Sequence, residues 1–272
     1  MQTFNIHTHT KRCNHAIGED EDYVVEAIKH GIKVLGFSDH VPFPNENVDE
    51  HRMKFHEKEA YLQSILKLKE KYKNQIDIKV GFECEYFEAY DTYYRELLEE
   101  VDYLILGQHL EESKTFDFCN RANDDDLLSY AKSVCAGIKT GYFTYLAHPE
   151  YFMLARKNFN EGCEKVIEEI AITCKEMNVP VEMNLKGISY GIKVYEDGEF
   201  FAYPHAKAIE IFCKYQNQGV FGLDVHEPSK FAEMSDYIQL FYQYYSDKIQ
   251  IIDSLVLRNP VKGDCIIESK ND

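Results

Sequence analysis

The sequence predicts an α/β fold, and more narrowly a barrel of seven βα units with a metal site at the C-terminal ends of its strands. Short apolar segments alternate with amphipathic segments of helical period along the chain. This pattern is typical of parallel strands joined by helices. Six of the apolar segments end on a histidine or a carboxylate. Because barrel enzymes carry their chemistry at this end of the strands, the shared position favours a barrel.

The predicted strands are the short apolar runs. They lie at residues 3–7, 34–39, 78–82, 103–108, 143–147, 179–184 and 220–223. Scattered surface histidines would not share a position relative to these runs, so the ends of the strands predict one site built from many segments. The residues at those ends are His7 and His9, His40, Glu83, His109, His148, and Asp224 with His226.

The predicted helices lie between these strands. In one of them Tyr61, Ile65 and Leu68 fall on one face at helical spacing. Gly31 is a stop signal for the first helix, and proline is favoured in the first turn of the last, at Pro204. Five helices are expected at 20–30, 57–72, 91–100, 124–139 and 160–178, and the sixth is the one that Pro204 opens. Three long connections are expected to stand over the mouth of the barrel, at 41–56, 110–123 and 185–202.

Length and composition indicate a single domain over residues 1–272. Of the 272 residues 44% are hydrophobic, which is enough for a large core. A barrel of this type needs roughly 250 residues. The formal net charge is −17, from 30 Lys+Arg and 47 Asp+Glu. Such a surface repels nucleic acids and anionic membranes at long range, so neither is expected as a partner.

Membrane insertion and secretion are not expected either. No stretch reaches the roughly 18 apolar residues of a membrane span. No basic start followed by an apolar run marks a signal peptide. Eight cysteines lie between Cys13 and Cys265 without a C-x-x-C pair. A disulfide framework is typical of shorter secreted chains, so these are interpreted as reduced thiols in the cytoplasm, mostly small buried apolar groups.

Nine side chains are candidate metal ligands. A divalent transition ion takes about four protein ligands in a closed site and fewer in a catalytic one. Nine ligands with a bridging Glu83 therefore suit two or three ions. Mixed imidazole and carboxylate ligation favours zinc, iron or manganese over calcium or magnesium. Closely spaced ions of this kind favour phosphoester hydrolysis. The candidates are His7, His9, His15, His40, Glu83, His109, His148, Asp224 and His226.

Simpler interpretations stay open for some of these residues. Asp39 precedes His40 and could be the ligand in its place. Glu85 shares a strand face with Glu83 and could replace it. His15 lies in a predicted loop, where a single histidine is more often solvated than a ligand. The other histidines do not end strands and are interpreted as surface or helix residues: His30, His51, His56 and His205.

The motifs together resemble the polymerase-and-histidinol-phosphatase (PHP) superfamily of metal hydrolases. The resemblance spans residue 4 to about residue 235, and within the superfamily it is strongest to the free-standing histidinol-phosphatases. The segments Glu182-Met183-Asn184 and Tyr203-Pro204-His205 carry that narrower match. The wider match rests on His7-Thr8-His9-Thr10, His15, Phe37-Ser38-Asp39-His40, Gly81-Phe82-Glu83, Gln108-His109, Ala147-His148-Pro149-Glu150 and Leu223-Asp224-Val225-His226.

The resemblance implies a distorted (βα)7 TIM-like barrel with a trinuclear site, and it also implies a reaction. The implied reaction is hydrolysis of L-histidinol phosphate to L-histidinol and phosphate in histidine biosynthesis, by attack of a metal-bound hydroxide on phosphorus. Glu83, Asp224 and His226 would be the catalytic ligands. The implied ligand sets are His7, His9, Glu83 and Asp224 for one ion, Glu83, His109 and His148 for a second, and His15, His40 and His226 for a third.

The resemblance also bears on phosphate binding. Three divalent ions would make the site locally positive in an acidic protein, and it would accept an anionic substrate. Arg156 follows His148 by eight residues and looks like the family's phosphate-binding arginine. The family often carries a further arginine shortly after the sixth-strand asparagine. That arginine is absent from the run Asn184–Ser189, and Lys186 or Lys193 is the candidate to replace it.

Other functions remain as alternatives. A PHP phosphoesterase could act on another small phosphomonoester or a nucleotide, which the absent arginine favours. An amidohydrolase also opens with H-x-H on a barrel, but that family usually places a carboxylated lysine where this chain has His109. A regulatory metal-binding module would not need ligands at an open barrel mouth. A polymerase-associated role is not expected for an acidic chain without a basic patch.

Overall fold

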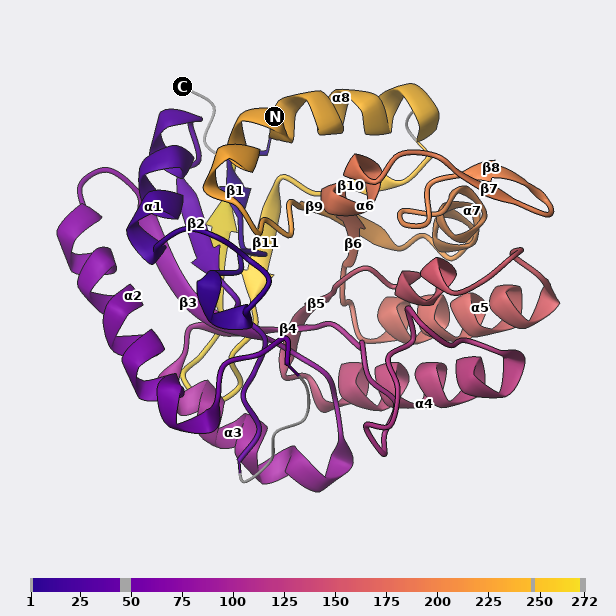
Figure 1. Cartoon of the computed structure of the whole chain (residues 1–272), viewed down its shortest axis with the longest axis horizontal. Helices are drawn as coiled ribbons and strands as arrows, with labels where there is room; N and C mark the ends of the chain where they lie inside the picture. Colours follow the sequence, from indigo (N-terminus) through magenta and orange to yellow (C-terminus); the bar gives the residue numbers. More distant parts are fainter. Residues whose placement is uncertain (1, 45–49, 246–247, 270–272) are drawn as a thin grey trace.

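An eight-stranded parallel sheet forms the centre of the molecule (Figure 1). The computed structural model describes residues 2–44, 50–245 and 248–269. All neighbouring strands are parallel. The first seven strands of this sheet are the seven predicted ones, so the predicted α/β barrel arrangement is confirmed. In sheet order they are β1 (Phe4–Asn5), β2 (Val34–Phe37), β3 (Asp77–Cys84), β4 (Tyr103–Leu106), β5 (Phe143–Leu146), β6 (Val181–Asn184), β9 (Gln218–Gly222) and β10 (Gln250–Ile251).

Two buried amide side chains help to close this sheet into a barrel. The backbones that follow β1 and β9 meet at an isolated parallel bridge between Thr8 and Val225. Nearer the start of β1, the Gln2 side chain donates to the Phe221 carbonyl at 2.7 Å and accepts from its N–H at 3.1 Å. Asn5 accepts a backbone N–H one step further along β9. Side chains therefore replace part of the ladder, which makes the barrel irregular at this seam.

Helices cover the outside of the barrel (Figure 1). The six predicted helices are present, and wherever a helix end was predicted the observed end lies within two residues of it. They are α1 (Asp20–Lys29), α2 (Lys58–Tyr72), α3 (Asp91–Glu100), α4 (Asp124–Thr140), α5 (Glu161–Glu176) and α7 (Ala206–Lys214). Short 3-10 helices lie in the connections: η1 (Lys11–Cys13), η2 (Phe55–Glu57), η3 (Glu88–Tyr90), η4 (Tyr151–Leu154) and η5 (Pro228–Glu233).

Local sequence explains where α4 and α5 begin. Asn123 accepts from Asp126 N at 3.0 Å, and the Asp126 carboxylate accepts from Asn123 N at 2.9 Å, so each satisfies a free N–H of the first turn. Asn160 caps α5 by accepting from Cys163 N at 3.1 Å. Gly141 ends α4 with φ 75°, a backbone conformation that glycine adopts without strain.

Several elements were not predicted from the sequence. The C-terminal hairpin of β11 (Ser254–Leu257) and β12 (Cys265–Glu268) inserts Leu255, Leu257 and Ile267 among apolar side chains of the barrel strands. It fills the barrel interior near the N-terminal ends of the strands. The predicted connection 185–202 contains α6 (Leu185–Ser189) and a hairpin of β7 (Lys193–Tyr195) and β8 (Gly198–Phe200), and α8 (Met234–Tyr245) follows β9.

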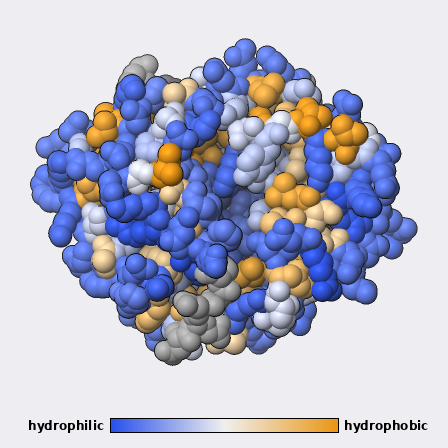
Figure 2. All heavy atoms as spheres, in the orientation of Figure 1, coloured by the Kyte–Doolittle hydropathy of each residue, from blue (hydrophilic) through white to orange (hydrophobic). Residues whose placement is uncertain are grey.

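The surface agrees with the acidic, polar composition. Figure 2 shows hydrophilic residues over most of one face, with a hollow near its centre. Among the helices of the described residues, none is both long and apolar enough to cross a membrane. Residues 45–49 of the predicted connection 41–56 lie outside the described residues.

We predict that Asn5→Ala destabilises the protein by roughly 1–3 kcal/mol, because it leaves buried backbone groups unsatisfied. Asn5 is 0% exposed, donates to His7 O at 3.0 Å and accepts from Leu223 N at 2.8 Å. Urea denaturation measures the free energy of unfolding. Gln63→Ala on the exposed face of α2 serves as the control. Equal stability of Asn5→Ala and the parent would mean that the seam does not depend on this amide.

Candidate metal centre

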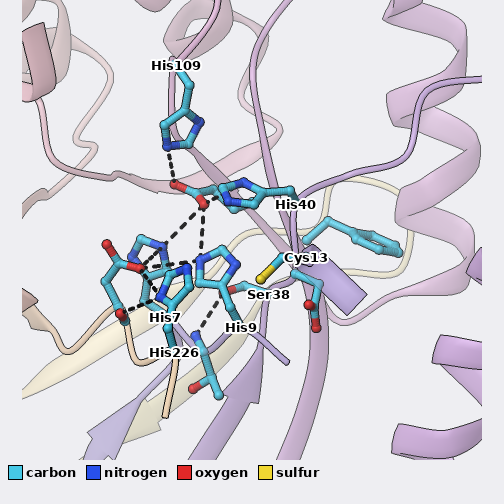
Figure 3. A network of polar contacts seen from close by, with 12 residues as sticks. His7, His9, Cys13, Ser38, His40, His109 and His226 are labelled. Atoms are coloured by element: carbon cyan, nitrogen blue, oxygen red, sulfur yellow. Dashed lines mark hydrogen bonds and ion pairs between the residues drawn. The ribbon is translucent and has the colours of Figure 1, made fainter. Parts of the chain in front are cut away.

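All nine predicted ligands lie at or beyond the C-terminal ends of the barrel strands and converge there. Figure 3 shows His7, His9, His40, His109 and His226 close together in this region. Centroids of neighbouring histidine rings are as close as 4.2 Å, and ligand atoms form several groups of three within 4.8 Å of one another. The spacing follows from the parallel sheet, which brings the same end of every strand to one side.

Glu83 lies at the centre of the cluster, and its two oxygens face different histidines. Oε2 lies 3.1 Å from His40 Nδ1 and 3.2 Å from His9 Nε2. Oε1 lies 2.7 Å from His148 Nε2 and 3.5 Å from His109 Nε2. The side chain is 1% exposed. A carboxylate with one oxygen toward each of two imidazole groups has the geometry of a bridging ligand.

Asp224 is the second carboxylate of the cluster. Its Oδ1 lies 3.4 Å from His9 Nε2 and 3.6 Å from His7 Nε2. The His7 Nε2 atom also lies 3.5 Å from Glu83 Oε2. Asn184 donates to Asp224 Oδ2 at 3.2 Å and so fixes the carboxylate from behind. His7, His9 and Asp224 therefore form one compact group of potential ligands.

Two of these ligands sit on an unusual backbone. His148 has φ 27° and Asp224 has φ 47°, both in the left-handed region that residues other than glycine rarely occupy. Such conformations cost free energy and persist where the surroundings impose them, often at functional sites. Both positions lie two residues after the end of a strand, where the turn directs the side chain into the cluster.

His15, His40 and His226 form a further group. The Nδ1 atom of His15 lies 2.7 Å from Cys13 O, and Nδ1 of His226 lies 2.9 Å from Asp224 O. Each ring therefore donates from Nδ1 and presents a lone pair at Nε2. The two Nε2 atoms lie 2.8 Å apart, so their lone pairs repel unless a cation or a proton lies between them.

The unsatisfied atoms of the cluster fit divalent transition ions. Among the described residues, His7 Nε2, His9 Nε2, His40 Nδ1 and Glu83 Oε2 are buried without a hydrogen-bond partner. Leaving such atoms unpaired costs about 1–3 kcal/mol each, more for charged groups. The atoms are imidazole nitrogens and carboxylate oxygens, the ligands that suit zinc, iron and manganese. The donor set therefore matches the predicted kind of metal.

The protonation states of most ligands are those that bind metal. Burial lowers the pKa of His9 to about 4 and holds the pKa values of His40 and His226 well below the usual range. Burial alone favours protonated Glu83 and Asp224, but neighbouring imidazole and cationic groups outweigh it and hold both pKa values well below normal. Neutral imidazoles and ionised carboxylates are the ligating forms.

A fully buried glutamate, Glu182, orients two of the ligands. Its Oε1 lies 2.6 Å from His7 Nδ1, and its Oε2 accepts from His148 N at 3.0 Å and from Asn184 Nδ2 at 2.9 Å. Although burial favours neutral imidazole, this carboxylate raises the pKa of His7. A carboxylate on the far nitrogen of a ligating histidine fixes its ring. Sequence reasoning missed this role, for which the signal was a carboxylate inside an apolar strand.

Glu85, the alternative to Glu83, has a different role. Its two oxygens each lie 3.0 Å from a nitrogen of the Arg52 guanidinium, and Oε1 also lies 3.1 Å from His109 Nδ1. Burial favours the protonated acid, but Arg52 outweighs it and holds the pKa of Glu85 well below its usual range. Glu85 therefore orients His109, and Glu83 is the carboxylate in the cluster.

The structure also bears on Asp39, the alternative ligand to His40, and on Cys13. Asp39 accepts from Thr10 N at 2.9 Å, and burial raises its pKa to about 7. It is absent from the ligand groups, whereas His40 belongs to two of them, which favours His40 as the ligand. Cys13 belongs to a group with His9 and His226, and Figure 3 shows it beside them. The sequence had suggested only a small apolar role for this thiol.

A cavity of about 400 Å³ opens onto the cluster. Residues from all three predicted connections line it, as expected if these segments stand over the barrel mouth. Lys186 lines the cavity with its Nζ 3.5 Å from Asp224 Oδ1. Burial lowers the pKa of Lys186, but Asp224 outweighs this effect and raises it, so the side chain is a cation. The connections contribute His51 and Arg52, then Leu110, Asp117 and Asn120, then Lys186 and Tyr190.

The structure does not bring Arg156 or Lys193 to this cavity. Arg156 donates to Ala122 O at 2.7 Å and pairs with Asp124 at 2.9 Å, so it braces the first turn of α4. Lys193 donates to backbone carbonyls of η4. Neither lines the cavity. In this structure an ion pair with Asp124 engages the Arg156 guanidinium, and the phosphate-binding role of Arg156 stays a prediction. Lys186 is the predicted substrate-binding cation that lines the cavity.

Two histidines that the sequence analysis did not count as ligands, His51 and His205, lie in different surroundings. His51 is exposed but lines the cavity, with its ring centroid 5.0 Å from that of His15. His205 is 0% exposed, caps α7, and stacks on Phe159 with centroids 4.8 Å apart. His51 therefore belongs to the surroundings of the cluster, and His205 belongs to the core.

One protein-family model matches about two thirds of the chain. The family model described as "PHP domain" matches residues 5–186. A Deinococcus radiodurans protein named "Probable histidinol-phosphatase" is 25% identical over 139 residues, which are 50% of this chain and 52% of that protein. The Bacillus subtilis "Histidinol-phosphatase" is 26% identical over 155 residues, 53% of this chain and 58% of that protein. The matched regions thus span about half the length of these two curated relatives.

A solved structure shares the fold over nearly the whole chain. It is the histidinol phosphate phosphatase of Lactococcus lactis, described as complexed with zinc, L-histidinol and phosphate. The TM-score is 0.65 at 14% sequence identity, and the match covers 96% of this chain and 98% of that one. At this identity the likeness establishes the barrel architecture.

We predict that Glu83→Gln loses metal, because the amide has one oxygen and no charge with which to bridge two ions. Elemental analysis of the purified variant should show at least one ion fewer per chain than the parent. His30→Ala, on a partly exposed histidine outside the cluster, should keep the parent's content. Full metal content in Glu83→Gln would show that Glu83 is not a bridging ligand.

Proposed function

The chain belongs to the PHP domain family, and from that premise and the geometry of the cluster we propose that it is a metal-dependent phosphomonoesterase that hydrolyses L-histidinol phosphate to L-histidinol and phosphate. The observation that carries the proposal is Glu83, whose two oxygens face separate histidine groups at the barrel mouth. The names of the curated relatives support the substrate. The zinc, histidinol and phosphate of the Lactococcus protein support it independently.

The proposed cofactor is two to three zinc, iron or manganese ions. Glu83 is proposed to bridge two of them. The first would bind His7, His9 and Asp224, and the second His109 and His148. The third would bind His15, His40 and His226, whose ligand atoms already lie within 4.8 Å of one another. When bound, ions of this kind provide a nucleophile from water at neutral pH and offset the charge on the phosphoryl oxygens.

The chain's own residues would position the substrate. Lys186 is proposed to contact the phosphate, because its ammonium reaches into the cavity beside Asp224 and His226. Glu182 and Glu85 hold the rings of His7 and His109, so the ligands do not have to reorganise when substrate binds. A preorganised cluster of this kind lowers the barrier by stabilising charge as it develops on phosphorus.

The proposed functional unit is one domain over residues 1–272. The family match ends at residue 186, but Asp224 and His226 belong to the same cluster and β9 to the same sheet. Both halves are therefore needed for the proposed ligand set.

A second candidate is a PHP phosphoesterase for another small phosphomonoester. The observation that favours it is the placement of Arg156 on Asp124, with a lysine rather than an arginine at the cavity. An ammonium offers a point charge and cannot form the two parallel bonds of a guanidinium, so the phosphate would be held less specifically.

We predict that the purified protein releases phosphate from L-histidinol phosphate with a higher kcat/KM than from a panel of small phosphomonoesters and nucleotides. A phosphate-release assay measures this preference. Prolonged chelation should abolish turnover, and zinc or manganese should restore it. Faster turnover of another panel member would favour the second candidate, and full activity in chelator would exclude the metal-dependent mechanism.

We predict that Lys186→Ala lowers kcat/KM for L-histidinol phosphate by roughly 10- to 100-fold, the scale of one charge-assisted hydrogen bond at about 1.5–3 kcal/mol. Metal content should stay close to that of the parent. Arg156→Ala should mainly lower the thermal stability, since it removes the brace on α4. The reverse result, with activity lost only in the Arg156 variant, would return the phosphate contact to Arg156.

A further inference from the structure

The cavity contains one carboxylate that the metal cluster does not use. Of the residues that the structure describes, three carboxylates line it: Glu83, Asp224 and Asp117. The first two face the histidines of the cluster, whereas Asp117 belongs to no ligand group. Among the residues that the structure describes, no lysine, arginine or histidine forms an ion pair with Asp117. Its negative charge is therefore available to a ligand in the cavity.

The position of Asp117 is fixed by its own loop. Asp117 forms an isolated antiparallel bridge with Leu110, which closes the tip of the connection 110–123. Its Oδ1 accepts from Cys119 N at 2.6 Å, and its Oδ2 accepts from the Tyr151 hydroxyl at 3.4 Å. Each oxygen therefore has a neutral donor, and within the described part of the chain neither oxygen is paired with a cation. Because the hydrogen bond from Tyr151 is long, Oδ2 can still accept a shorter hydrogen bond from a charged donor.

Tyr151 links Asp117 to the metal cluster. Its ring centroid lies 4.9 Å from that of His109 and 5.2 Å from that of His148, while its hydroxyl points to Asp117. The Asp117 carboxylate therefore lies about one tyrosine side chain away from the second proposed ion. A phosphorylated amino alcohol has its phosphate and its ammonium a few bonds apart, which suits this separation.

A carboxylate in a phosphate-binding cavity is unfavourable unless the substrate also carries a positive charge, because like charges repel in a partly desolvated site. We propose that Asp117, supported by Tyr151, binds the ammonium group of the substrate's alcohol portion and so selects phosphomonoesters of amino alcohols. The inference rests on the proposed phosphatase function and names its specificity determinant. The phosphate faces the metal cluster and the ammonium faces Asp117, so the substrate has one orientation.

The test compares two substrates on one isosteric variant. Asp117→Asn keeps an oxygen for Cys119 N and removes the charge. The substrates are L-histidinol phosphate and its deamino analogue, 3-(imidazol-4-yl)propyl phosphate, which differ by the amino group. At about pH 7.5 both imidazoles are mostly neutral, because imidazole has a pKa near 6.5, while an alkylamine keeps its proton. The comparison therefore isolates the ammonium.

The parent should prefer L-histidinol phosphate, and Asp117→Asn should lower kcat/KM for it by about 10- to 100-fold, the scale of one lost charge-assisted hydrogen bond. Turnover of the deamino analogue should be unchanged or improved. Tyr151→Phe keeps the ring against the histidines and should reduce the preference by a smaller factor. Glu112→Gln removes a charge from the same connection outside the cavity lining and should change neither substrate.

Equal losses on both substrates, or no loss on either, would overturn the assignment of Asp117. Metal content of Asp117→Asn should match that of the parent, and a fall in metal would assign Asp117 to the metal cluster instead. A parent protein that turns over other phosphomonoesters but not L-histidinol phosphate would overturn the proposed function itself. The two failures are therefore distinguishable, since the second is visible before any variant is made.

Discussion

One buried carboxylate, Glu83, determines the organisation of the site. It is 1% exposed and surrounded by imidazoles, and a charge so placed is stable only when cations compensate it. The fold makes room for it: a Cβ on Gly107 of the neighbouring strand would lie 2.0 Å from Glu83 Oε1. A glycine at the end of β4 is thus required for the carboxylate to reach between the two histidine groups. Gly222 makes room for Glu182 in the same way.

The barrel supplies the geometry that this carboxylate needs. Parallel strands deliver ligands from residue 7 to residue 226 to one end of the sheet, and the backbone bridges Thr8–Val225 and His40–Glu83 hold their ends in register. The seam between β1 and β9 matters most, because it brings the first motif beside Asp224. Behind the proposed ligands, Glu182 and the Glu85–Arg52 pair fix the rings, so the proposed cation site of this acidic protein is preorganised.

Much of this arrangement could be predicted because it depends on local patterns. The strands, the six helices and the converging ligands follow from apolar periodicity and from the position of each histidine after a strand. Two of the elements that were missed have weak local signals: the β11–β12 hairpin fills the barrel by long-range packing, and α6 is only five residues long. The ion pair of Arg156 with Asp124 could not be predicted, because sequence distance from His148 does not indicate which carboxylate the guanidinium meets. The position of Asp117 in the cavity could not be predicted, because a single aspartate in a loop belongs to no periodic pattern.

The central proposal is that the nine side chains form a multinuclear transition-metal centre. Elemental analysis of the protein, purified without chelator and compared with its phosphatase activity, tests this claim most directly. The account predicts two to three ions of zinc, iron or manganese per chain, with activity rising and falling in proportion to metal content. A protein that holds one ion or none and retains full phosphatase activity in the presence of chelator would contradict it.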